Sequence, residues 1–190
     1  MNKLKKVFKK IQEFSSDIYV ADYTNQTSSA KGVCIEDTPF ADIESFHLHN
    51  DHKIPLIAVN LEENNSIFSR SDENCECLIR VKDCRKGWIL LCELKYCKEK
   101  NIVENTDKAY RQLRSTWKIL VDKKIIAKKR VKSYFNISIP DYSNKAPFTS
   151  FGISQNDKLE WLSSNKIKLL GYNDVLVVNE GILNVPTKEI

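Results

Sequence analysis

The sequence predicts an α/β fold in which a mixed central sheet is flanked by helices. Three observations lead to this prediction: runs rich in β-branched residues alternate with helical patterns, two such runs (ECLIRVKD and GWILLCELKY) are separated by a short turn, and residues 106–121 carry apolar side chains at helical spacing. Alternating strands and helices are typical of a sheet covered by helices. Residues 1–190 are treated as a single domain, because no change of composition marks a boundary.

Helical spacing predicts three helices. Apolar side chains predict an opening helix that ends near Ser15, and a helix of about four turns that begins near Thr106. A further helix is predicted over residues 38–50, with Thr38 as its N-cap and Pro39 in its first turn.

Runs of β-branched and aromatic residues predict the strands. The two runs around CRK predict an antiparallel hairpin that closes at residues 85–87. Further strands are predicted at 17–23, 54–60 and 131–139, and in the segments IKLL and DVLVV near the end of the chain.

Charge and composition limit the class of protein. The formal net charge is +5, and lysines gather in residues 3–10 and 123–132, which suits a polyanionic partner or a solvated face. No stretch has the roughly 18 apolar residues of a membrane span, and no export signal is visible, so we expect a cytoplasmic protein that does not act on membranes. The cysteines, most of them within residues 75–97, are expected to be reduced.

The predicted hairpin brings charged side chains together. Glu93 and Lys95 lie two positions apart in a strand, so both project from one face. Folding the hairpin places Glu93 opposite the region of Glu76, so that two carboxylates and an ammonium converge. Because the burial of unpaired charges costs several kcal/mol, the group is either a structural salt bridge or a metal-binding active site.

The residue types fit a hard divalent cation. Carboxylate oxygens of Glu76 and Glu93, with the backbone carbonyl of Leu94 as a third ligand, are the donors that Mg²⁺ or Mn²⁺ prefers. An ion held there can activate water and stabilise the charge of a phosphate under attack.

These residues resemble the PD-(D/E)XK nuclease superfamily, the restriction-endonuclease-like enzymes. The resemblance covers about residues 54–140 and rests on an acid, Glu76, opening one strand of a hairpin, on Glu93-Leu94-Lys95 in the next strand, and on a following helix that supplies Gln112. It implies a restriction-endonuclease-like sheet, in which the two glutamates hold the metal, Lys95 orients the attacking water and Gln112 supports the water or the phosphate.

The match departs from the family pattern at its first acid. Glu76 stands where the family usually has aspartate after proline, and the neighbouring acids Asp72 and Glu73 remain alternatives for this position, whereas Asp83 lies too near the predicted turn. The resemblance also implies a further metal-binding acid from an early segment, for which Glu44 or Glu36 is the candidate by its position in the chain.

The expected function is a metal-dependent nuclease that hydrolyses phosphodiester bonds, of DNA rather than RNA, in antiviral defence or DNA repair. Basic side chains are expected to contact backbone phosphates without base specificity; the candidates are Arg111, Arg114, Lys118, Lys128, Lys129 and Arg130. A domain of this size is expected to act as a homodimer or with a protein partner that delivers the target. The alternative is a catalytically inactive binding or scaffold subunit with the same fold, in which Glu93 and Lys95 only pair.

Two other patterns offer metal ligands. HLHNDH, at residues 47–52, spells a zinc motif of metallo-β-lactamase-like hydrolases, but the chain has no histidine other than His47, His49 and His52 to complete it. We therefore interpret it as a polar loop or helix end, with adventitious metal binding as the alternative. The cysteines lack the paired spacing of zinc knuckles and are expected to act as small apolar side chains.

Overall fold

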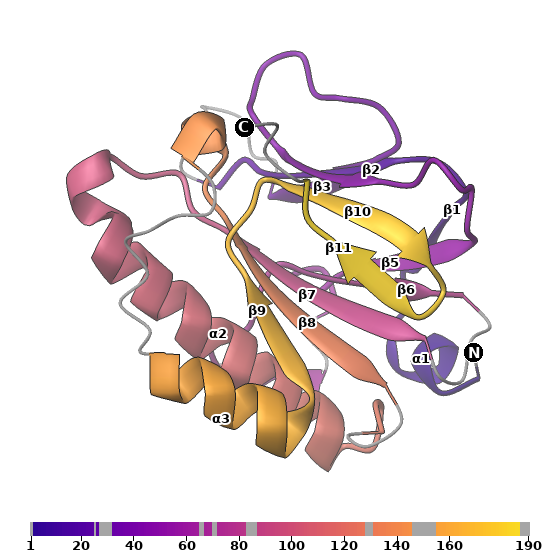
Figure 1. The fold of residues 1–190 in the computed structure, drawn as a ribbon. Coiled ribbons are helices and arrows are strands. Elements are labelled where there is room, and N and C mark those ends of the chain that lie inside the picture. Colours follow the sequence, from indigo (N-terminus) through magenta and orange to yellow (C-terminus); the bar gives the residue numbers. More distant parts are fainter. Residues whose placement is uncertain are drawn as a thin grey trace.

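The computed structural model describes residues 2–24, 26, 32–64, 67–69, 72–82, 87–127, 131–145 and 155–186. The chain forms three layers, with helices on one side, a central sheet in the middle and a second sheet on the other side (Figure 1). The central sheet has six strands in the order β1-β5-β6-β7-β8-β9, and the second sheet has five in the order β11-β10-β4-β2-β3. Both sheets mix parallel and antiparallel pairs, which confirms a mixed α/β architecture.

The elements follow one another along the chain in this order: α1 (Asn2–Val7), β1 (Gln12–Phe14), β2 (Ile18–Asp22), β3 (Val33–Glu36), β4 (Phe46–His49), β5 (Leu56–Asn60), β6 (Cys77–Val81), β7 (Trp88–Leu94), η2 (Glu99–Asn101), α2 (Ile102–Asp122), β8 (Lys132–Ser138), η3 (Pro140–Lys145), α3 (Gln155–Asn165), β9 (Ile167–Leu170), β10 (Asp174–Asn179) and β11 (Ile182–Asn184).

The predicted hairpin forms the middle of the central sheet. β6 and β7 pair antiparallel, with Cys77 opposite Cys92, and β7 then pairs parallel with β8. Residues 85 and 86 of the predicted turn at 85–87 lie outside the described residues. Every residue of β7 is buried, because one face of the strand packs under the helices and the other under the second sheet.

The helices cover one face of the central sheet. Leu113 and Leu120 of α2 pack on Ile89 and Leu91 of β7 in one apolar cluster, which Leu4 and Phe8 near α1 extend. The apolar side chains of α2 recur every three or four residues, as a helix lying on a sheet requires. α2 begins at Ile102, one turn earlier than the sequence predicts.

A second sheet, rather than helices, covers the other face of the central sheet. Its strands alternate apolar and polar side chains: Ile18 and Val20 of β2, like Phe46 and Leu48 of β4, point into the cluster shared with β6 and β7. This two-residue period is that of a half-buried strand. Among the described residues, the central sheet is therefore flanked by helices on one side and by the second sheet on the other.

Two helical predictions are wrong in detail. The segment 38–50 forms no helix; bends lead into β4, because alternation in Phe46-His47-Leu48-His49 dominates over the weak capping signal. α1 ends at Val7, short of Ser15, and residues further along pair with β5 as β1. The predicted strands at 17–23, 54–60 and 131–139 are confirmed as β2, β5 and β8.

The two sheets are joined at one edge by side chains. The Asn60 side-chain amide, at the end of β5, donates to the carbonyl of Val33 at 2.7 Å, and that of Gln12 donates to the carbonyl of Ile35 at 3.0 Å. Within the described residues the cysteines are free thiols, and no helix is long and apolar enough to cross a membrane.

Candidate functional site

The hairpin register brings the predicted acids together. With Cys77 opposite Cys92, the next step along the ladder puts Glu76 across from Glu93. The backbone N–H of Leu94 donates a hydrogen bond to the carboxylate of Glu76, and the ammonium of Lys95 forms an ion pair with the carboxylate of Glu93. The predicted convergence of two carboxylates and one ammonium is therefore present in the structure.

The two carboxylates and the ammonium are largely buried. Glu93 is 0% exposed and Glu76 4%, and the Lys95 side chain retains 14% of its exposure. One carboxylate oxygen of Glu93, Oε2, is buried without a hydrogen-bond partner in the part of the chain that the structure describes. A buried acceptor left unpaired costs about 1–3 kcal/mol or more, so this oxygen is a position that a cation would stabilise.

Burial sets the protonation of the group. Burial raises the pKa of Glu93 to about 7, although the charge of Lys95 opposes the shift. Burial and the neighbouring charge of Glu93 raise the pKa of Glu76 well above its usual range. For Lys95, burial alone would lower the pKa, but the charges of Glu93 and Glu76 outweigh burial and raise it. At neutral pH the group therefore holds protons that a divalent cation could replace.

Two further acids surround the group and were not predicted from the sequence. Asp22, at the end of β2, raises the pKa of both Glu76 and Glu93 through its charge. Glu62 lies just after β5, and its residue as a whole is exposed although its carboxyl group is partly covered. This partial burial and the charge of Asp22 raise the pKa of Glu62, while the charge of Lys95 opposes the increase. We call Asp22, Glu62, Glu76, Glu93 and Lys95 the acid cluster.

The junction between the sheets positions these additional acids. The backbone N–H of Val33 donates to the Glu62 carboxylate, and Val33 pairs with Asp22 across β2 and β3. Gly32 leaves room for this carboxylate, since a Cβ there would lie 3.2 Å from Glu62 Oε2. The sequence offered one signal for these acids: Asp22 and Glu62 lie at or just after the ends of the predicted strands 17–23 and 54–60.

Gln112 is held beside the segment that leads into Glu76. Its Nε2 amide donates to the carbonyl of Asn74 at 3.1 Å, and one turn along the same face of α2 the hydroxyl of Thr116 accepts from the N–H of Cys75 at 2.8 Å. The Gln112 Oε1 atom is buried without a partner among the described residues. The helix thus fixes the position of Gln112 next to the first acid.

The structure places Glu44 apart from the acid cluster. Glu44 is exposed in the loop before β4, its carbonyl accepts the Tyr96 hydroxyl at 2.6 Å, and it lines a separate cavity. Asp22 is the acid from an early segment whose charge raises the pKa of Glu76 and of Glu93. Leu94, whose carbonyl is the predicted backbone ligand, donates its N–H to the carboxylate of Glu76.

The predicted basic residues of α2 share one surface. Arg111, Arg114 and Lys118 line a hollow of about 380 Å³ on the side of α2 that meets α3, where the Arg114 guanidinium lies 4.7 Å from the ring centre of Trp161. This surface lies between α2 and α3, whereas Glu93 and Lys95 lie at the end of β7. Lys128, Lys129 and Arg130 lie outside the described residues.

A hollow of about 770 Å³ opens beside the end of β7. Tyr96, the neighbour of Lys95, lines it together with Lys98, Lys100 and Asn101 at the start of α2. The charges of Glu76 and Asp22 contribute to raising the pKa of Tyr96, after burial, so the hollow adjoins the acid cluster. Its lysines give it a charge opposite to that of the acids.

The acid cluster offers donors of the type that a hard divalent cation prefers. Its donors are carboxylate oxygens, four acids act on one ammonium through their charge, and Glu93 Oε2 has no hydrogen-bond partner among the described residues. In the described part of the chain, the three ligand atoms that lie within 4.8 Å of one another belong to Asp17, His47 and His49, so the carboxylates of the acid cluster would have to rotate to share one ion. A scan against protein-family models and searches of curated proteins and of solved structures find no significant match to this chain. The geometry of the cluster is therefore the ground for a functional proposal.

Proposed function

We propose that this chain is a metal-dependent nuclease that hydrolyses phosphodiester bonds, with DNA as its substrate. The observation that carries the proposal is the convergence of Glu76, Glu93 and Lys95 across the β6–β7 hairpin, with one carboxylate oxygen of Glu93 unpaired. This is the arrangement that the resemblance to the PD-(D/E)XK nucleases implies. A restriction-endonuclease-like sheet is part of the same proposal.

Four residues of the acid cluster have a role in this proposal. Glu76 and Glu93, with the Leu94 carbonyl, would hold Mg²⁺ or Mn²⁺, which when bound supplies charge stabilisation and lowers the pKa of water. Lys95 is held by Glu93, so its ammonium can donate hydrogen bonds to the attacking water or to a phosphate oxygen. Asp22 adds negative charge that favours cation binding.

The substrate would approach through the hollow beside β7. Lys98 and Lys100 can contact phosphates there. Arg111, Arg114 and Lys118 would bind a more distant part of the backbone. Such contacts give affinity that depends strongly on salt and little on sequence.

The proposed biological setting is cytoplasmic antiviral defence or DNA repair, with a homodimer or a protein partner delivering the target. These statements rest on the resemblance. They define which substrates to test first, namely double-stranded plasmid and then single strands.

One observation favours an inactive scaffold as the second candidate. Glu93 is 0% exposed and already paired with Lys95, as a structural ion pair inside a sheet would be. A structural pair, however, leaves the unpaired Glu93 oxygen and the neighbouring charge of Asp22 without explanation. Cleavage activity separates the two candidates.

The test is plasmid cleavage by tag-free protein in Mg²⁺ and in Mn²⁺. Glu93→Gln and Lys95→Ala should abolish cleavage. Two matched controls make the same chemical changes at exposed positions of α2, Glu104→Gln and Lys108→Ala, and should cleave like the wild type. Absence of cleavage by the wild type in every divalent ion, or equal cleavage by all five proteins, would favour the scaffold.

A further inference from the structure

A second group of ligand side chains lies on the second sheet. Asp17, His47 and His49 each offer an atom for a metal, and these atoms all lie within 4.8 Å of one another. Asp174 adjoins them, since its Oδ1 lies 3.1 Å from His49 Nε2 and 3.7 Å from His47 Nδ1. We call these four residues the histidine cluster.

Strand alternation places the cluster on the outer face of the second sheet. Phe46 and Leu48 of β4 point into the core, so His47 and His49 point away from it. The register puts Asp174 of β10 directly beside His47, while Asp17 precedes β2 on the other side of β4. Side chains of three adjacent strands therefore meet at one place.

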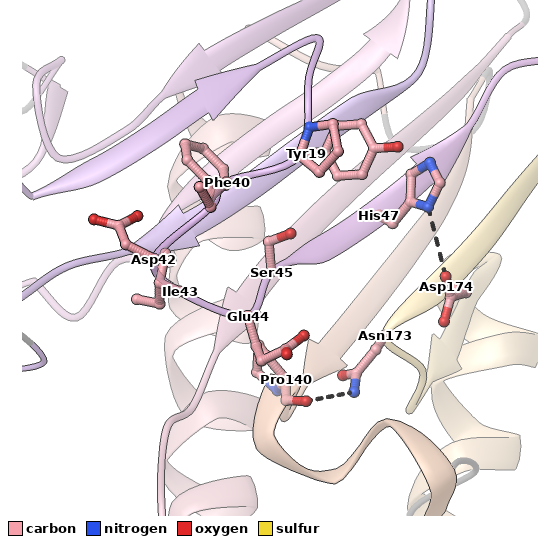
Figure 2. Close-up of a pocket in the computed structure, with 12 residues that line it drawn as sticks. Tyr19, Phe40, Asp42, Ile43, Glu44, Ser45, His47, Pro140, Asn173 and Asp174 are labelled. Atoms are coloured by element: carbon pink, nitrogen blue, oxygen red, sulfur yellow. Dashed lines mark hydrogen bonds and ion pairs between the residues drawn. The ribbon is translucent and has the colours of Figure 1, made fainter.

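Packing fixes the orientation of both imidazoles. The ring of Tyr19 stacks on His47 with centres 4.2 Å apart and an angle of 17° between the planes, and the ring of His49 lies 3.6 Å away. Figure 2 shows Tyr19 next to His47, and His47 turned toward Asp174. A pre-oriented ligand loses little freedom on binding an ion.

The carboxylates orient the ligand atoms. Asp17 receives the backbone N–H of Asn50 on Oδ1 at 2.8 Å, which directs Oδ2 to His47 Nε2, also at 2.8 Å. Asp174 faces the other nitrogen of His47, as carboxylates do behind metal-bound histidines. The pair of atoms Asp17 Oδ2 and His47 Nε2 is thus placed where two ligands of one ion would lie.

We propose that Asp17, His47 and His49 bind a divalent transition-metal ion of the zinc class, with Asp174 orienting the imidazoles and one coordination position left open. Two nitrogens and one carboxylate oxygen suit Zn²⁺ and its neighbours better than Mg²⁺. Zinc bonds of about 2.0–2.2 Å place tetrahedral ligands about 3.3 Å apart, so small side-chain rotations from the present positions suffice.

One of the three proposed ligands borders a cavity. His47 lines a cavity of about 530 Å³, together with Asp174, Tyr19, Phe40 and Asn173 (Figure 2). Three protein ligands leave a fourth tetrahedral position, where water or a small anion completes the coordination of zinc. This site is independent of the acid cluster and of the proposed nuclease activity.

The test is binding of Co²⁺, a spectroscopic substitute for Zn²⁺, by tag-free full-length protein after treatment with a chelator. Excess Mg²⁺ is present throughout, because it competes for carboxylate oxygens and poorly for imidazole nitrogens. One equivalent should bind, with visible absorption bands but no thiolate charge-transfer band, and Zn²⁺ should displace it. His47→Ala and His49→Ala should each weaken binding by at least about 100-fold, since loss of an outer-shell partner alone costs about 10- to 100-fold.

His52→Ala is the matched control, because it removes the remaining histidine from an exposed turn. It should bind Co²⁺ like the wild type, and Zn²⁺ should raise the melting temperature of both proteins but not that of His49→Ala. His49 is 30% exposed, so its substitution by alanine leaves the core intact even if His47→Ala fails to fold. Binding that is absent from the wild type, or unchanged in folded His49→Ala, overturns the proposal.

Discussion

The acid cluster and the histidine cluster place titratable side chains in opposite surroundings. Glu76 and Glu93 lie in the interior with oxygen donors and raised pKa values, whereas His47 and His49 remain partly exposed, and each lies beside a carboxylate. Excess buried negative charge favours a hard cation, while paired nitrogen donors near water favour a transition metal. Burial and donor type therefore predict two metal preferences within one small chain.

The largest expected effect is on cleavage. Glu93→Gln removes a charge next to Lys95 and a proposed metal ligand, and the rate of plasmid cleavage should fall by at least about 10²- to 10³-fold, the range for loss of one stabilising group. Binding of Co²⁺ by the histidine cluster should stay unchanged in this variant. A variant that loses both properties would contradict the independence of the two clusters.

A smaller effect is expected at Asp22. Its charge acts on the buried glutamates, so Asp22→Asn should weaken Mn²⁺ binding by about 10- to 100-fold, as for outer partners of metal ligands. Calorimetric titration measures this change. Asp51→Asn, at an exposed turn, is the matched control and should bind Mn²⁺ as the wild type does. Equal affinities of wild type and Asp22→Asn would remove Asp22 from the site.

The acid cluster should also lower stability at high pH. The pKa of Glu93 is 4.5 in its ordinary state and about 7 in the fold, and that of Glu76 is raised too, so above pH 4.5 the folded chain retains protons that the unfolded chain has released. The free energy of unfolding without metal should therefore fall as pH rises from about 4.5 to above 7, and level off once the folded carboxyls are ionised.

Glu76→Gln tests this dependence on pH. The amide oxygen can accept the N–H of Leu94 as the carboxylate does, while the buried charge is absent. At pH 8 and without metal the variant should be more stable than the wild type by about 1–3 kcal/mol, and the difference should vanish near pH 4. Urea unfolding at both values measures it. A variant that is less stable at pH 8 would show that the carboxylate stabilises the fold.

The smallest expected effect concerns the basic surface of α2. Arg114→Ala removes a guanidinium that packs on Trp161, which should lower the free energy of unfolding by about 0.5–1 kcal/mol. Binding of duplex DNA, measured by fluorescence anisotropy, should weaken by the same factor for all sequences. The slope of the logarithm of the binding constant against the logarithm of the salt concentration should become smaller in magnitude by about one. Lys108→Ala is the control, and an unchanged slope in Arg114→Ala would place the DNA elsewhere.

The central sheet and the acidic pair could be predicted because their signals are local. Glu76, Glu93 and Lys95 belong to two strands joined by one turn, so side-chain alternation and hairpin register were enough to bring them together. The same is true of α2, where one long apolar stripe and a following strand determine its packing. Gln112 was expected from the resemblance to the PD-(D/E)XK nucleases, and its side chain lies one helical turn from Thr116, beside the segment that leads into Glu76.

The second sheet and its histidine cluster could not be predicted in the same way. β4 pairs with β10, which lies more than a hundred residues further along the chain, and no local sequence pattern in either segment predicts this pairing. The alternation in Phe46-His47-Leu48-His49 was a usable signal for a strand, but capping residues favoured a helix. Asp22 comes near the buried glutamates because the edges of the two sheets are joined, for example by the hydrogen bond from Asn60 to the carbonyl of Val33, the β3 residue paired with Asp22.

Mn²⁺ binding tests the proposed role of the acid cluster most directly. Electron paramagnetic resonance measures free Mn²⁺ during titration of tag-free protein in the His47→Ala background, where the histidine cluster is disabled. We expect one or two bound ions, lost on Glu93→Gln and retained on Glu104→Gln. No bound Mn²⁺, or equal binding with Glu93→Gln, would show that Glu76, Glu93 and Lys95 form a structural ion pair and not a metal site.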